Sequence, residues 1–139
     1  MSSEFKVQIV TPERMFFQGE AELLIVKTTE GDLGIMKNHI DYVAPLDIGT
    51  VKIKTQGMFK EAVISGGFVQ IDKEITTILT EAAEWPHEID LDRARAEKEE
   101  AEKLLEKLKG DAESPHKSLA EARYKKAINR IHAVEKKQD

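Results

Sequence analysis

The chain has 139 residues, with 21 Lys and Arg against 26 Asp and Glu, a formal net charge of -5 and no Cys. This length allows one ordinary domain or two small ones. The lack of Cys excludes disulfides, thiolate nucleophiles, Cys-based zinc sites and iron–sulfur clusters. The mildly acidic total argues against a general nucleic-acid binder. The longest apolar run, Leu23–Val26, is far shorter than the roughly 20 residues of a membrane span. With no basic-then-apolar signal pattern at the N-terminus, we expect a soluble, unexported chain.

From residue 5 to about residue 81, apolar residues alternate with polar ones, as at Phe5, Val7 and Ile9, or form short runs. A period of two is typical of strands. No amphipathic helical stripe in this half is long enough for a crossover, so a parallel α/β sheet is not expected. We predict eight to ten short strands packed sheet on sheet. Turn residues recur at Gly19, Glu30–Asp32 with Gly34, Asp47–Gly49, Gln56–Gly57, Gly66–Gly67 and Asp72–Lys73.

The composition changes after Trp85-Pro86, where Val, Thr and Phe give way to Ala, Glu, Lys and Leu. This change predicts two domains, residues 1–86 and 87–139. A first helix is expected from about residue 90 to 109, with Gly110 as its C-terminal cap. Ser118 with Glu121 reads as a capping box that opens a second helix, with Ser114-Pro115 in the connection. Both apolar stripes are narrow and rich in Ala, so we expect a closely packed but weakly held antiparallel hairpin.

The last helix carries most of the local positive charge. Seven cations and two anions lie between Lys117 and Lys137, which gives this segment a net charge of +5. Its natural partner is therefore acidic. The first helix mixes both signs, so we interpret its charged face as solvated and assign it no binding role by charge alone.

No nucleotide-loop, nucleophile-elbow, zinc-protease or EF-hand motif occurs in the sequence. The four histidines, at positions 39, 87, 116 and 132, have no ligand-like spacing, so no metal site is expected. The glycine pair Gly66–Gly67 precedes a strand-like run instead of a helix, which favours a bulge or a sheet corner over a phosphate loop.

The segment from Glu30 to His39 has two interpretations. It places an acid, two or three apolar side chains and a histidine at one end of the sandwich, as an interaction loop would. The alternative is a hairpin whose apolar residues turn inward.

The order of these segments resembles the ε subunits of bacterial F-type ATP synthases over nearly the whole chain. The resemblance rests on Val10–Glu13 followed by Phe17 and Gly19, on Glu30–Ile35 with His39, on Ser65–Phe68 and on the helical tail. It implies a β + α chain: an N-terminal sandwich of two five-stranded sheets followed by an antiparallel two-helix hairpin. It also implies a rotor part with no catalytic residues and no catalytic cofactor.

The resemblance implies partners as well. The sandwich would join the γ subunit and sit on the c-ring, coupling proton flow to ATP synthesis on the catalytic α/β subunits, at the cytoplasmic face of the bacterial membrane and without a span of its own. In this chain Lys37-Asn38 replaces the Pro-Gly pair that usually precedes the histidine, and Asn tolerates the left-handed geometry of such a turn. The c-ring-facing residues by resemblance are Asp32, Leu33, Ile35, Met36 and His39.

In the family the helical tail acts as a brake on ATP hydrolysis by extending along γ. By resemblance, Arg123, Lys126 and Arg130 of the basic last helix would then meet an acidic segment of the catalytic β subunit. Such a tail can also bind ATP as a regulatory ligand, through an I/L-D-x-x-R-A motif that Ile89, Asp90, Arg93 and Ala94 match. Glu84 and the same three cations of the last helix would complete this ATP site.

Two observations bear on the ATP site. Lys126 stands where strong binders have Arg, and Lys lacks the planar donor fork of Arg. The alternative role of Asp90 and Arg93 is a helix cap with an i, i+3 ion pair. Two rival functions stay open on the residues: a free-standing ATP sensor, and an enzyme with its site at the mouth of the sandwich, although no catalytic constellation supports the enzyme.

Overall fold

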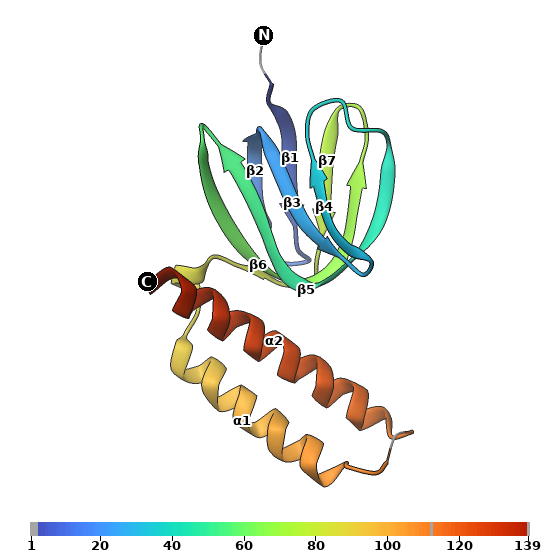
Figure 1. Ribbon diagram of the computed structural model, residues 1–139, viewed down its shortest axis with the longest axis vertical. Helices are drawn as coiled ribbons and strands as arrows, with labels where there is room; N and C mark the ends of the chain where they lie inside the picture. Colours follow the sequence, from blue (N-terminus) through green and yellow to red (C-terminus); the bar gives the residue numbers. More distant parts are fainter. Residues whose placement is uncertain (1–2, 112, 139) are drawn as a thin grey trace. The chain divides into compact units, whose positions relative to one another are not determined.

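The computed structural model describes residues 3–111 and 113–138, without the side chains of residues 137 and 138 (Figure 1). The chain divides into two compact units, Met1–Trp85 and Pro86–Asp139, called here the sandwich and the helical unit. The outer ends of the two predicted domains, residues 1–2 and 139, lie outside the described residues, as does the side chain of Lys137.

The strands of the sandwich belong to one mixed sheet, with the order β2-β1-β7-β6-β5-β3-β4 and with β8 paired to β6. The pair β1–β7 is parallel and the other pairs are antiparallel. The strands are β1 Phe5–Val10, β2 Met15–Ala21, β3 Leu23–Thr28, β4 Gly31–Ile35, β5 Tyr42–Thr55, β6 Met58–Ile71, β7 Ile75–Leu79 and β8 Ala83–Glu84.

The expected division into two five-stranded sheets is wrong, because β5 and β6 are continuous strands of 14 residues each. Their pairing passes from Leu46–Gly67 to Ile48–Ser65, which leaves Asp47 and Gly66 as an irregularity between the two pairs. The turn signals read at Asp47–Gly49 and Gly66–Gly67 therefore mark a bend inside two strands and not strand ends. The long strands curve from one layer of the sandwich into the other, so the sheet stays continuous around its core (Figure 1).

The glycine pair at this bend has the geometry that a bulge requires. Gly66 and Gly67 have φ angles of +87° and +111°, which L side chains rarely adopt. A Cβ at Gly67 would also collide with the carbonyl oxygen of Leu79. The interpretation of this pair as a bulge or sheet corner is confirmed. Gly19, by contrast, lies inside β2 and marks no turn.

The core of the sandwich consists of apolar side chains at every second position of the strands. The inward positions of β1 and β3 are fully or nearly fully buried, as expected for period-two strands with one face inside. Trp85 closes one side, with its ring 4.6 Å from the ring of Phe16. The largest fully buried side chains are Val7, Ile9, Leu24, Val26, Ile35, Val51, Ile53, Val69 and Ile78.

The helical unit consists of the short η1 (Pro86–Glu88), α1 (Leu91–Lys107) and α2 (Pro115–Gln138). The two long helices run antiparallel, and we call them the hairpin (Figure 1). α2 begins at Pro115 and not at Ser118, so the capping box predicted there is wrong. Proline suits the first position of a helix because its missing N–H needs no partner there. The hydroxyl of Ser114 accepts the N–H of His116 at 3.3 Å.

Small side chains fill the seam of the hairpin. Its buried alanines are Ala94, Ala101, Ala120, Ala127 and Ala133. Leu119 and Ile128 of α2 are exposed instead. The expected Ala-rich seam is confirmed, and it buries little apolar area per residue compared with a leucine seam. Neither helix combines the length and the apolar character that crossing a membrane would need, as far as the described residues extend.

Candidate functional site

The start of α1 carries the residues of the predicted nucleotide motif. Asp90 has an extended backbone and its carboxylate accepts the backbone N–H of Arg93 at 3.1 Å. This makes Asp90 the N-cap of α1, where a carboxylate also meets the positive end of the helix dipole. Ile89 and Ala94 are buried beside it. The motif therefore builds a well-formed helix start with one exposed arginine.

The guanidinium of Arg93 does not pair with Asp90. Its Nε donates to Oε1 of Glu97 at 3.1 Å, one helical turn further along α1. The cap that we gave as the alternative role of Asp90 is thus present, whereas the ion pair of Arg93 spans i, i+4 and not i, i+3. The side chain of Arg93 is 74% exposed and faces solvent with most of its donors.

Arg123, Lys126 and Arg130 lie on one face of α2, because spacings of three and seven residues return to the same side of a helix. Arg130 is closest to the nucleotide motif: its Nη1 donates to Oε2 of Glu97 at 3.2 Å, across the hairpin. Arg123 lies seven residues earlier, about 10 Å away along the helix axis. The hairpin therefore brings Arg93 and Arg130 together through Glu97 and leaves Arg123 further along α2.

Sequence reasoning missed Glu97. Its signal was its position four residues after Arg93, since an acid and a base at this spacing face each other on a helix. Glu84 lies in β8, in the sandwich. The cluster of the helical unit is therefore defined as Arg93, Glu97 and Arg130.

The second candidate region is the segment from Asp32 to His39. Asp32, Leu33 and Ile35 belong to β4, and Ile35 is fully buried in the core. Met36 follows β4 and is 63% exposed. Four residues of extended strand, about 13 Å, separate Asp32 from Met36. The expected set thus does not share one end of the sandwich: Asp32 lies at the β3–β4 turn, and Met36 with His39 lies at the opposite end of β4.

The turn around His39 keeps the geometry that the sequence predicted. Asn38 has a φ of +69°, so it adopts the left-handed conformation expected of it in place of glycine. The N–H of His39 donates to the carbonyl of Met36 at 3.2 Å, and its Nδ1 lies 2.8 Å from the carbonyl oxygen of Ile40. Because a carbonyl oxygen can only accept, Nδ1 carries the proton.

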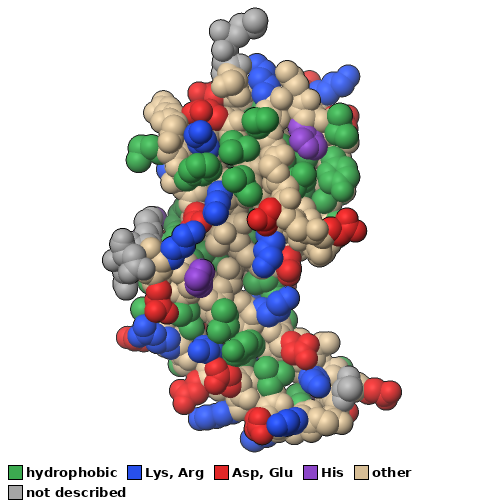
Figure 2. All heavy atoms as spheres, viewed as in Figure 1, with side chains coloured by type: hydrophobic (Ala, Val, Ile, Leu, Met, Phe, Trp, Pro, Cys, Tyr) green, Lys and Arg blue, Asp and Glu red, His purple; other side chains and the backbone are tan. Residues whose placement is uncertain are grey.

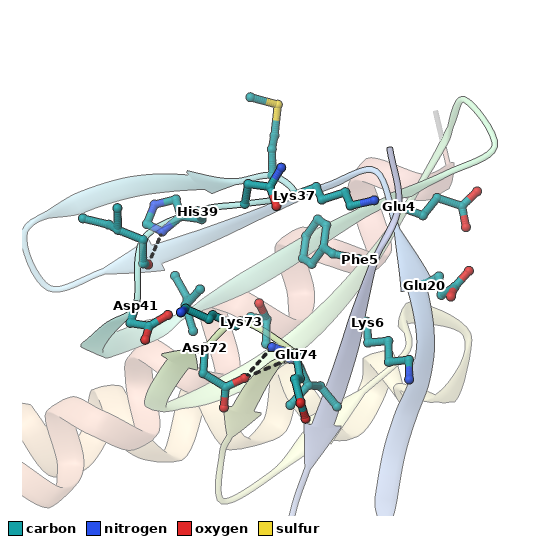
Figure 3. Close-up of a pocket in the computed structure, with 16 residues that line it drawn as sticks. Glu4, Phe5, Lys6, Glu20, Lys37, His39, Asp41, Asp72, Lys73 and Glu74 are labelled. Carbon is teal, nitrogen blue, oxygen red and sulfur yellow. Dashed lines mark hydrogen bonds between the residues drawn. The ribbon is translucent and has the colours of Figure 1, made fainter. Parts of the chain in front are cut away.

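The loop 36–41 forms one wall of a pocket of about 790 Å³ (Figure 3). The start of β1 and the β6–β7 turn form the other walls, and Figure 3 shows acids and lysines from all three segments around its mouth. Its charged lining residues are Glu4, Lys6, Glu20, Lys37, Asp41, Asp72, Lys73 and Glu74, with His39 beside them.

Two carboxyls at this pocket titrate away from their ordinary values. The hydrogen bond that protonated Glu4 donates to the Glu20 carboxylate raises the pKa of Glu4, and partial burial and the negative charges of Glu20 and Glu22 raise it further. The backbone N–H groups of Ile75 and Glu74 lower the pKa of Asp72, whose Oδ1 accepts them at 3.0 and 2.9 Å. Asp72 is exposed at the rim, and Glu4 is half-buried there. Charges of both signs thus surround the mouth of the pocket.

A row of apolar side chains crosses the outer face of the sheet. Its members are register partners: Met15 with Val10, Val10 with Leu79, Leu79 with Phe68, and Phe68 with Pro45. We call these five residues the apolar row. Met15, Phe68 and Leu79 are large apolar side chains that remain exposed. Figure 2 shows apolar side chains gathered on the visible face of the sandwich among charges of both signs.

Comparison with known proteins accounts for both units. Residues 4–86 match the model of the ATP synthase Delta/Epsilon chain beta-sandwich domain, and residues 87–135 match the long alpha-helix domain of the same chain. The ATP synthase epsilon chain of Alkaliphilus oremlandii is 57% identical over 80% of this chain and 83% of its own length. The epsilon chain of Alkaliphilus metalliredigens is 44% identical over 99% of this chain and 100% of its own.

The fold also recurs in a solved structure. A chain in the cryo-EM structure of the Euglena gracilis mitochondrial ATP synthase matches with a TM-score of 0.76 at 20% identity, over 100% of this chain and 84% of that chain. The chain therefore belongs to the ATP synthase epsilon chain family, whose members are non-catalytic subunits of that enzyme. This membership confirms the resemblance found in the sequence. It argues against the rival hypothesis that the chain is an enzyme with its site at the mouth of the sandwich.

Proposed function

We propose that this chain is a rotor part of the central stalk of an F-type ATP synthase, at the cytoplasmic face of the bacterial membrane. The family match over both units carries this proposal. In this role the sandwich binds the γ subunit and the c-ring, and it transmits rotation between the ring and the catalytic α/β subunits.

The apolar row is the surface that best fits γ. Contiguous exposed apolar side chains on a soluble domain mark protein contacts, and the row leaves Phe68 and Leu79 exposed in register. The loop 36–41 is the surface that best fits the polar loops of the c-ring, since it combines exposed Met36 with the charged rim of the pocket. Asp32 would belong to a separate contact, because it lies at the other end of β4.

The test of this role is reconstitution. Added to an ATP synthase that lacks its ε subunit, the chain should co-purify with the γ-containing complex and restore ATP-driven proton pumping. A chain that stays monomeric and never associates with the complex would favour the rival function, a free-standing ATP sensor.

The hairpin is proposed as a regulatory element that inhibits ATP hydrolysis when it opens and extends along γ. Its alanine seam supports this, because small buried side chains hold two helices with a modest free energy that a partner can overcome. In the extended state Arg123, Lys126 and Arg130 would face an acidic segment of the catalytic β subunit.

ATP is proposed as the ligand that holds the hairpin closed. The convergence of Arg93 and Arg130 on one anionic group supports this, since paired guanidinium groups bind phosphate well. Calorimetric titration of the full chain with ATP, beside Arg93→Ala, tests the site. Binding that is lost in the variant supports the ligand, whereas no binding near millimolar ATP would leave Asp90 and Arg93 with a structural role only.

A further inference from the structure

Glu97 lies between two arginines of the hairpin and contacts both of them. Its two carboxylate oxygens are used separately: Oε1 accepts from Nε of Arg93 at 3.1 Å, and Oε2 accepts from Nη1 of Arg130 at 3.2 Å. One arginine belongs to α1 and the other to α2, 37 positions apart in the chain. A single carboxylate thus bridges both helices through two charge-assisted hydrogen bonds.

The exposure of the three side chains indicates how a ligand would meet this arrangement. Arg130 is 20% exposed and Glu97 is 39% exposed, while Arg93 lies largely in solvent. Arg130 is therefore the less accessible of the two arginines, and Glu97 contacts it directly. The local charge is also reduced, because one negative group offsets one of the two guanidinium charges before any ligand arrives.

Other acids of α1 do not have this position. Glu102 pairs with Lys98 at 3.7 Å, an i, i+4 contact that stays within α1. This pair also joins a Glu to a cation, lies one to two turns further along the helix and does not join α2. It therefore provides a matched control for removing one carboxylate from α1.

We propose that Glu97 is an internal competitor of the nucleotide: it accepts one donor of Arg93 and one of Arg130 in the ligand-free hairpin, and the phosphates of bound ATP displace its carboxylate. This inference rests on the proposed ATP site. It makes Glu97 a determinant of ATP affinity. It also gives the ligand-free hairpin an ionic clasp between α1 and α2, so that binding exchanges one anionic bridge for another and shifts the closed–open equilibrium less than it would in a chain without this acid.

The test is an ATP titration of the full chain and three variants, Glu97→Gln, Glu102→Gln and Arg93→Ala, at one ionic strength. Glu97→Gln should bind ATP more tightly than the parent chain, because no carboxylate then competes for the two arginines. The gain should be only about three- to tenfold, because exposed ion pairs are individually weak. Glu102→Gln should bind as the parent does, and Arg93→Ala should lose binding. Far-UV circular dichroism checks that each variant keeps its helices.

A second measurement follows the carboxyl group of Glu97 directly in the parent chain. In the parent chain, the carboxyl carbon resonance of Glu97, assigned with Glu97→Gln, should move toward the value of an unpaired Glu when ATP is added. It should not move when ATP is added to Arg93→Ala.

The outcomes distinguish failure of the competitor role of Glu97 from failure of the ATP site itself. Equal or weaker binding by Glu97→Gln, with Arg93→Ala inactive, would overturn the competitor role and keep the ATP site, as would a Glu97 resonance that stays fixed during ATP binding. Binding by Glu97→Gln but not by the parent chain would support the competitor role most strongly. No binding by any of the four chains near millimolar ATP, or equal binding by all four, would overturn both the site and the competitor.

Discussion

Phe68 of β6 and Leu79 of β7 are direct partners across the sheet, and their side chains are 54% and 47% exposed on its outer face. An aromatic and an aliphatic side chain paired in this way would normally be covered. Here they form the middle of the apolar row. Their exposure is the structural reason for assigning a protein partner to this face of the sandwich.

Replacing Phe68 by Ala should weaken binding to a γ-containing complex and leave the fold intact. Loss of a large apolar anchor at an interface costs about 2 kcal/mol, which is about 30-fold in the dissociation constant. Titration of the variant against the purified complex measures this change.

Phe59→Ala is the control, since Phe59 is similarly exposed but lies at the other end of β6. It should bind γ like the parent chain. Equal losses from both variants, or none from Phe68→Ala, would argue against the apolar row as the γ surface.

Gly67→Ala should destabilise the sandwich by more than about 3 kcal/mol, because it combines a strained φ with a backbone collision. Gly57 has a φ of +77°, but a Cβ added there would meet open space. Gly57→Ala should therefore destabilise the sandwich by only about 1–2 kcal/mol. Urea unfolding followed by the fluorescence of Trp85, the single tryptophan, measures both. Similar losses for the two would show that the close approach to Leu79 is unimportant.

Ala127→Leu should open the hairpin by overpacking its seam, at a cost of about 1–3 kcal/mol to the closed state. Ala127 is buried, whereas the neighbouring Ile128 is exposed, so Ile128→Leu is the control. Thermal melting of the helical signal in circular dichroism should show an earlier transition for Ala127→Leu alone. If both variants melt like the parent chain, the seam is not a close-packed interface.

The low pKa of Asp72 predicts a stability that depends on pH. A carboxyl whose pKa is lowered by folding stabilises the native state above its unfolded pKa, and this contribution is lost as the pH falls through the folded pKa. Asp72→Asn should therefore lower the melting temperature at pH 7 and match the parent chain in strong acid. A constant difference at all pH values would mean that its charge is unimportant.

Glu4 should show the opposite dependence. Its raised pKa means that its contribution is fully present below the unfolded pKa and is lost as the pH rises through the folded pKa. Glu4→Gln should thus melt higher than the parent chain at pH 7, with the difference fading in acid. A lower melting temperature at pH 7 would contradict the repulsive contact with Glu20.

Much of the fold could be predicted from local patterns, and the misplaced parts have clear causes. Period-two alternation identified the strands, and the change of composition at Trp85-Pro86 identified the start of the helices. The turn signal at Asp47–Gly49 lies inside β5 instead of at a strand end, because a sequence does not distinguish a bulge, where pairing resumes, from a turn. Ser114-Pro115 was read as a break, although Pro115 occupies the first position of α2.

In the candidate sites, too, local contacts could be predicted from the sequence and long-range contacts could not. The cap at Asp90 was visible in the sequence because capping is local. The bridge from Glu97 to Arg130 joins residues 33 positions apart, and only the packing of the hairpin reveals it. Likewise, the apolar row consists of side chains from five strands whose register no local pattern specifies.

The central claim is that this non-catalytic subunit regulates hydrolysis through the basic face of α2. Its most direct test is the ATP hydrolysis rate, at low ionic strength, of an ATP synthase reconstituted with the parent chain, with Arg123, Lys126 and Arg130 all changed to Gln, or with Lys103, Lys107 and Lys109 of the α1 end changed to Gln. The α2 variant should lose most of the inhibition while remaining assembled, and the α1 variant should inhibit normally. Removing Arg130 also breaks its contact with Glu97, which should make the hairpin easier to open and would by itself increase inhibition. A decrease in inhibition therefore reports the lost contact with the partner. Unchanged inhibition by the α2 variant would contradict the account.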